Sequence, residues 1–232
     1  MKLIKRKQSG FTLVEIAIVL VIIGLLLGGV LKGQELINSS KVKNISDQQL
    51  GITAAFFAFQ DRYRAVPGDY LAANAIANIP VGPSGVQFVY TGNGDGAVTA
   101  AETGQAWTQL TSAGFINCSV CTSIVAATSA TSPTNVYGGW SQIISDAVYL
   151  DAGTAVAVNN LKSGGNIPVG VIAEVDRKID NGAPNTGIFR FSVSAQPTAP
   201  TAAGAAPACA NTTGVWNAAS TQLNCGGTSL LR

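Results

Sequence analysis

The first hydrophobic pattern along the chain is an unbroken apolar run. Residues 11–31 read FTLVEIAIVLVIIGLLLGGVL, in which only Thr12 and Glu15 are polar. As a helix that rises about 1.5 Å per residue, this segment is about 30 Å long, enough to span the hydrocarbon core of a bilayer. No A-x-A cleavage pattern follows the run. We therefore expect a retained membrane helix and not a removed secretory signal.

An amphipathic pattern follows the apolar run over residues 32–66. Its apolar residues recur at steps of three, four or seven, and they are Val42, Ile45, Ile52, Phe56, Phe59 and Tyr63. This spacing places them on one face of a helix that runs to about Ala65, where Pro67 and Gly68 stop it. The two patterns together predict one helix about 80 Å long, whose second half packs on a head domain.

The pattern after Pro67 consists of short apolar runs separated by Gly, Pro and Asn. Such runs predict strands over residues 86–90, 155–158, 169–175 and 187–193. Helices are predicted over residues 102–113 and 141–149. The fold class that we expect is α+β, with a small antiparallel sheet in a head formed by residues 67–232.

Composition and charge exclude some classes of function. Hydrophobic residues make up 47% of the chain and charged residues only 11%, against roughly 25% charged in an ordinary soluble domain. The chain has no histidine, so the commonest general base and metal ligand is missing. No basic patch with interleaved aromatic residues points to nucleic acid. We therefore expect neither an enzyme nor a nucleic-acid partner.

The basic residues around the apolar run predict its orientation. Four of them lie within residues 2–7, whereas three lysines are spread over residues 32–43. By the positive-inside rule, this asymmetry favours a cytoplasmic N-terminus. Everything after residue 31 is then expected outside the cytoplasm.

A short basic leader, Gly10 and the sequence FTLVE at the start of an apolar helix resemble the class III signal of type IV prepilins. The segments RAVPGDY, GNGDG and WTQL, in this order, are similar to those of large-headed type IV pilin-like proteins. The resemblance implies a type IV pilin fold, with the hydrophobic half of its helix protruding from the head. It also implies that prepilin peptidase cuts after Gly10 and methylates the new N-terminus at Phe11. The leader is then 1–10, the filament-core helix 11–31 and the head-packed half of the helix 32–66.

Glu15 is unusual because it puts an ionisable group into a membrane segment. Burying such a group costs on the order of a few kcal/mol unless it is paired. Snorkelling to the headgroups or protonation would each tolerate it. Alternatively, after cleavage the free amino group of Phe11 lies one helical turn away and carries a positive charge at neutral pH. The resemblance implies that Glu15 pairs with this group on a neighbouring subunit during assembly.

The segment TGNGDGAVTAAE fits a twelve-residue EF-hand calcium loop at all positions but the first. Its ligands at positions one, three, five, seven, nine and twelve would be Thr91, Asn93, Asp95, Ala97, Thr99 and Glu102. Two carboxylates predict weak Ca²⁺ binding. The alternative is a Gly-rich turn, with Glu102 favoured by the dipole of the following helix.

A second acidic cluster is formed by Asp176, Asp180, Asn181 and Asn185. It is interpreted either as another cation site or, preferably, as a turn whose side chains bond local amides.

The four cysteines are expected outside the cytoplasm, where disulfides form. They are Cys118, Cys121, Cys209 and Cys225, and three connectivities are open. The resemblance to pilins favours Cys209 with Cys225, which leaves Cys118 and Cys121 as a local bridge. A zinc site or a redox-active pair is less favoured, because no histidine and no thioredoxin-like unit accompanies the CxxC motif.

These observations predict a structural subunit of a type IV pilus. It would begin in the inner membrane with its head in the periplasm and end in an extracellular filament of this chain and other pilins. A pseudopilin of a type II secretion system is one alternative. A membrane-anchored, calcium-dependent binding module or adhesin is the other.

Overall fold

The computed structural model describes residues 10, 12–82, 91–193, 206–211 and 213–232. A single helix, α1 (Leu13–Tyr63), takes up 51 residues and joins both hydrophobic patterns, as predicted. The chain divides into two compact units, Met1–Ser40 and Lys41–Arg232. Each unit is described by itself.

The described part of the first unit is mainly the apolar beginning of α1. Its large hydrophobic side chains are exposed; Leu13 is 92% exposed and Leu25 73%. By length and composition, α1 can cross a membrane: its most apolar window has a mean hydropathy of 2.8, and none of that window is buried within the chain. Exposed leucine and isoleucine on this scale require a lipid or protein environment, because each exposed side chain forgoes about 1.5–3 kcal/mol of burial free energy.

The second unit contains a four-stranded antiparallel sheet in the order β1-β2-β4-β3. Its strands are β1 (Gln142–Asp146), β2 (Val158–Lys162), β3 (Phe189–Phe191) and β4 (Gly227–Leu230). The C-terminal strand β4 pairs with both β2 and β3, so the end of the chain lies in the middle of the sheet. The predicted α+β class with a small antiparallel sheet is confirmed.

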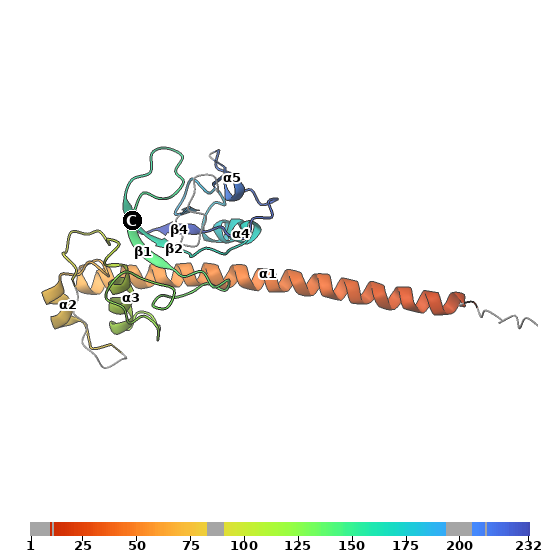
Figure 1. The fold of residues 1–232 in the computed structure, drawn as a ribbon, viewed down its shortest axis with the longest axis horizontal. Helices are drawn as coiled ribbons and strands as arrows, with labels where there is room; N and C mark the ends of the chain where they lie inside the picture. Colours follow the sequence, from red (N-terminus) through yellow and green to blue (C-terminus); the bar gives the residue numbers. More distant parts are fainter. Residues whose placement is uncertain (1–9, 11, 83–90, 194–205, 212) are drawn as a thin grey trace, which may run out of the picture. The chain divides into compact units, whose positions relative to one another are not determined.

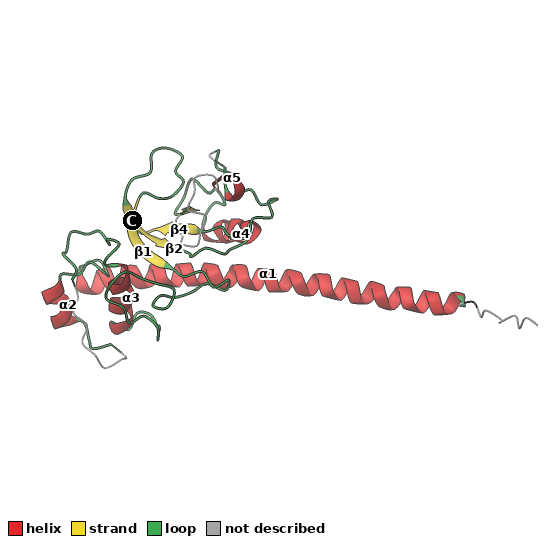
Figure 2. Cartoon of the chain, in the orientation of Figure 1, coloured by secondary structure: helices red, strands yellow, loops and turns green. Residues whose placement is uncertain are grey.

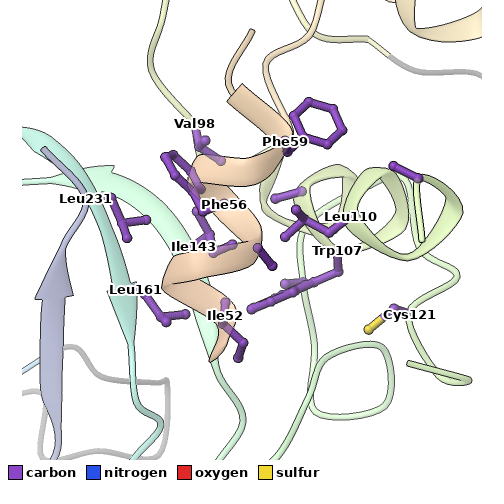
Figure 3. Packing of buried hydrophobic residues seen from close by; sticks show 14 of the residues in the cluster. Ile52, Phe56, Phe59, Val98, Trp107, Leu110, Cys121, Ile143, Leu161 and Leu231 are labelled. Atoms are coloured by element: carbon purple, nitrogen blue, oxygen red, sulfur yellow. The ribbon is translucent and has the colours of Figure 1, made fainter. Parts of the chain in front are cut away.

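One hydrophobic core lies around the last turns of α1 (Figure 3). Ile52, Phe56 and Phe59 are buried there, on the face that the amphipathic pattern predicted. Trp107 and Leu110 reach this face from α3 (Thr103–Ser112). Side chains of the sheet and of the residue that follows it complete the core, and they are Ile143, Leu161 and Leu231.

A second core lies between an earlier part of α1, α4 (Val169–Ile179) and β3. Val42 and Ile45 of α1 belong to it, as do both phenylalanines of β3. Cys209, at the end of α5 (Ala206–Cys209), and Trp216 close it from the C-terminal segment. The head is thus assembled on α1 from parts of the chain that are far apart in sequence.

Two predicted elements in the head are wrong. Residues 169–175, predicted as a strand, belong to α4, which follows Pro168 with its helix-compatible φ of −58°. The buried residues Val169, Ile172, Ala173 and Asp176 recur with helical spacing, and this packing outweighs the strand preference of the valines. Residues 141–149, predicted as a helix, contain β1, whose register with β2 runs from Gln142↔Lys162 to Asp146↔Val158.

The other predicted elements of the head differ less from the observed ones. Helix 102–113 is confirmed as α3, and strand 187–193 contains β3. The strand predicted over 155–158 lies later, as β2. The strand predicted over 86–90 lies outside the described residues. Three elements, α2 (Ala72–Asn78), α5 and β4, were not predicted.

Candidate functional site

The start of α1 is capped by reciprocal hydrogen bonds between Thr12 and Glu15. The Thr12 amide and Oγ1 both donate to Glu15 Oε2, each over 2.8 Å. In return, the Glu15 amide donates to Thr12 Oγ1 over 3.3 Å. This is a capping box, which satisfies amides that the first helical turn leaves unpaired. It also holds the carboxylate at the positive end of the helix dipole.

The predicted processing site lies directly before this cap. Gly10 is exposed, and a Cβ placed on it would meet no other atom within 4 Å. Phe11, the predicted methylated residue, lies outside the described residues. The carboxylate of Glu15 is also exposed in the isolated chain, so it remains accessible to a partner.

The predicted calcium loop is held by hydrogen bonds of its own. Asn93 Oδ1 accepts from the Asp95 amide, and Asp95 Oδ1 accepts from the Ala97 amide over 2.9 Å. The Ala97 amide and, next, the Asn93 side chain lower the pKa of Asp95, so its carboxylate is charged at neutral pH. Glu102 Oε2 accepts from the Thr99 amide and hydroxyl.

An acidic residue outside the motif also belongs to this loop. Both carboxylate oxygens of the buried Asp69 accept loop amides, from Gly94 over 2.8 Å and from Gly96 over 2.6 Å. Thr91 is bound to the side chain of Gln105. Within the described parts of the chain, no three His, Cys, Asp or Glu side chains are grouped to hold a metal ion. Calcium binding therefore stays a prediction.

The second acidic cluster joins the end of α4 to the C-terminal segment. Asp176 Oδ2 accepts from the indole N–H of Trp216 over 2.6 Å. Asp180 accepts the backbone amides of Asn181, Ile188 and Phe189. The preferred interpretation, side chains that bond local amides, describes Asp180. It does not describe Asp176, which accepts from the distant side chain of Trp216 and not from a local amide.

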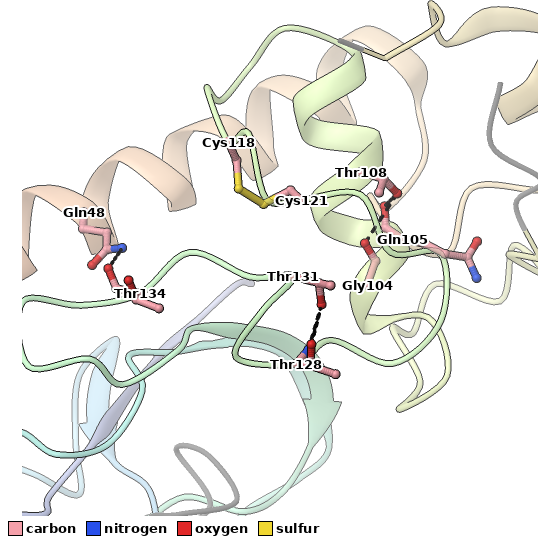
Figure 4. Close-up of a disulfide and its surroundings, with 9 residues drawn as sticks. All are labelled: Gln48, Gly104, Gln105, Thr108, Cys118, Cys121, Thr128, Thr131 and Thr134. Atoms are coloured by element: carbon pink, nitrogen blue, oxygen red, sulfur yellow. Dashed lines mark hydrogen bonds between the residues drawn. A yellow bond between two sulfur atoms is a disulfide. The ribbon is translucent and has the colours of Figure 1, made fainter. Parts of the chain in front are cut away.

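The structure contains two disulfides, and they are the favoured pairing. Cys209 and Cys225 close the C-terminal loop around Trp216. Cys118 and Cys121 form a local bridge beside α1 and α3 (Figure 4), with Cys121 buried in the first core. In the loop that follows, the backbone carbonyl of Thr134 accepts from the Gln48 side chain of α1 over 3.1 Å. The bridge therefore stabilises a loop that is itself bound to α1.

Comparison with protein families decides what the capped N-terminus is. The family model of the prokaryotic N-terminal methylation motif matches residues 5–31. These residues are the class III signal peptide of type IV pilins. Comparisons with curated proteins and with solved structures gave no match.

This signal implies processing by prepilin peptidase and assembly with other pilin-like subunits. The motif and the apolar half of α1 are consistent with membrane anchoring followed by assembly at the surface. The match ends at residue 31, so the comparisons assign no role to the head.

Sequence reasoning overlooked two residues at these sites. Thr12 had a signal, because Ser or Thr followed three residues later by Glu is the pattern of a capping box. Asp69 had none, because its hydrogen bonds to Gly94 and Gly96 cross more than twenty residues of chain.

Proposed function

We propose that this chain is a structural subunit of a type IV pilus filament, with no catalytic activity. It is cut after Gly10, methylated at Phe11 and assembled with copies of itself and with other pilins through the apolar half of α1. The observation that carries the proposal is the methylation motif over residues 5–31, with Glu15 fixed one turn from the new N-terminus.

The geometry of the helix start supports a direct role for Glu15 in assembly. Among the described residues, Thr12 of the same subunit donates to its carboxylate. Cleavage after Gly10 would place a positive amino group at Phe11, next to this capping box. A neighbouring subunit's amino group can then replace the Thr12 donors, exchanging bonds from neutral donors for a bond between two opposite charges. The pairing neutralises both charges before the helices enter the apolar filament core.

Replacing Glu15 by Val tests the proposal. Each buried amino group would lose its partner, at a cost on the order of 3 kcal/mol per subunit, so we expect processing to continue and filaments to disappear. The matched control is Glu35→Gln on the same helix. Glu35 forms an exposed pair with Lys32, which contributes little, so filament yield should stay normal.

The measurements are immunoblots for the processed form and electron microscopy of sheared surface material. Normal filaments from the Glu15→Val variant would overturn the proposal. If deletion of the gene stops protein secretion and no surface filament is seen in the wild type, the subunit belongs to a secretion pseudopilus instead.

A further inference from the structure

The second acidic cluster contains a carboxyl group whose environment requires an explanation. Asp176 lies in the last turn of α4 and is 0% exposed. Trp216, from the loop closed by Cys209 and Cys225, donates its indole N–H to Oδ2 over 2.6 Å. Among the described residues, no donor meets hydrogen-bonding geometry at the other oxygen, Oδ1. A buried, charged carboxylate with one oxygen unpaired is costly.

Asp180 lies one turn further along α4, as its C-terminal cap. Its Oδ2 accepts the Phe189 amide over 2.9 Å and the Ile188 amide, while Oδ1 accepts the Asn181 amide. Three backbone amides thus donate to Asp180, and both of its carboxyl oxygens are acceptors. Gly187 packs tightly against the Asp180 side chain. A Cβ at Gly187, whose φ is +76°, would lie 2.1 Å from Asp180 Oδ2.

No cation faces this pair of carboxyl groups in the described structure. On α4, Arg177 is exposed and pairs with Glu174, and Lys178 is exposed. On β3, Arg190 pairs with Asp151. The helix α1 contributes Val42 and Ile45 to this core, and the nearby Lys41 lies over the ring of Tyr137. The C-terminal segment 206–231 has no charged side chain in its sequence.

We propose that Asp176 and Asp180 hold one proton between them, carried by Asp176, and that this proton fastens the disulfide-closed loop 209–225 to the end of α4. A protonated Asp176 directs an O–H donor at the Asp180 carboxylate while its Oδ2 still accepts from Trp216. Loss of the proton leaves two carboxylates in a buried site without a facing cation, and separation of the loop from α4 would relieve this by exposing Asp176 to water. This contact between the loop 209–225 and α4, here called the latch, is therefore stable at acidic pH and weakened at alkaline pH.

The pKa of Asp176 sets the pH range over which the contact between the loop and α4 weakens. Burial first, and then the neighbouring Asp180, raise the pKa of Asp176 from its ordinary value to about 7, against the smaller opposing effects of Trp216 and the Gly182 amide. In the unfolded chain this group loses its proton near pH 4. Between about pH 4 and 7 the folded head binds the extra proton, so its stability falls as pH rises over this range.

The test compares thermal unfolding of the full chain in detergent micelles at pH 5 and pH 8, with Asp176→Asn as the variant. Asparagine has the shape of the protonated acid but cannot ionise. We expect the wild-type Tm to be lower at pH 8 by about 5 °C, and the variant to show little of this difference. Glu174→Gln, an exposed carboxyl group on the same helix, is the matched control and should keep the wild-type dependence.

A second measurement applies if Asp176→Asn does not fold. In the wild type, the ¹⁵N-labelled indole N–H signal of Trp216, assigned by its loss in Trp216→Phe, should shift with pH around a midpoint near 7. Parallel pH profiles for wild type and Asp176→Asn would overturn the proposal, as would an indole signal that does not shift between pH 5 and 8. So would a Tm at pH 8 that millimolar Ca²⁺ restores in the Asp95→Asn variant, whose loop 91–102 is disabled, because the pair would then hold a cation and not a proton.

Discussion

At the scale of single residues, the acidic side chains are the most informative, because the chain has few of them and their surroundings differ. Glu15 is held in a cap at the start of an apolar helix, and Asp176 is buried against Trp216. Asp69, Asp95 and Glu102 lie in or beside one loop and each binds backbone amides there. The same residue type therefore lies in three different surroundings: an exposed helix cap, a buried site and a loop whose amides it binds.

Calcium binding to the loop 91–102 is a prediction at this scale. Ten millimolar Ca²⁺ against a dissociation constant of about 1 mM would stabilise the head by roughly 1.4 kcal/mol, so Tm should rise by a few degrees. Asp95→Asn and Glu102→Gln should each abolish this rise, whereas Asp47→Asn, on the helix, should not. The measurement is thermal unfolding of the full chain in detergent with and without Ca²⁺. Calorimetry without a binding signal at millimolar Ca²⁺, together with an unchanged Tm, would contradict the prediction.

At the scale of elements, local patterns predicted the structure where it depends on local contacts. The apolar face of α1 was predicted correctly because its periodicity is long and regular, and the helix α3 was also predicted correctly. The interpretation failed at β1, which has five residues, and at α4, whose valines favour a strand. Whether Ile143 belongs to a helix or a strand depends on its ladder with Leu161, and no local pattern contains that information. The same holds for β4, whose four residues pair with two distant strands.

The disulfides give a prediction for the C-terminal elements. Removing the Cys209–Cys225 bridge by a double Ala substitution should lower the free energy of unfolding by about 3 kcal/mol, because a loop of sixteen residues is released in the unfolded chain. The same change at Cys118 and Cys121 releases a much shorter loop and should cost about 2 kcal/mol. Urea unfolding of both variants in detergent compares them. A larger loss for the Cys118–Cys121 pair would contradict this ordering.

At the scale of the whole molecule, the chain divides into two units, one that exposes apolar side chains and one that buries its own cores. The helix α1 contributes residues to both. Met1–Ser40 contains the processing signal and apolar side chains that are exposed in the single chain. Lys41–Arg232 buries its own two cores. The candidate site was predictable from sequence because processing by a peptidase reads a short linear motif, Gly10 followed by FTLVE. The head's surface has no such linear code, so its binding partners could not be predicted.

Mass spectrometry of sheared surface filaments tests the central claim most directly. The account predicts that this protein is present in the sheared material, that its first residue is Phe11 and that this residue carries one added methyl group. The Gly10→Val variant is the matched control and should leave unprocessed precursor in the membrane and none in the filaments. A surface form that begins at Met1 or downstream of residue 31, or the absence of this chain from filaments that the cells do produce, would contradict the account.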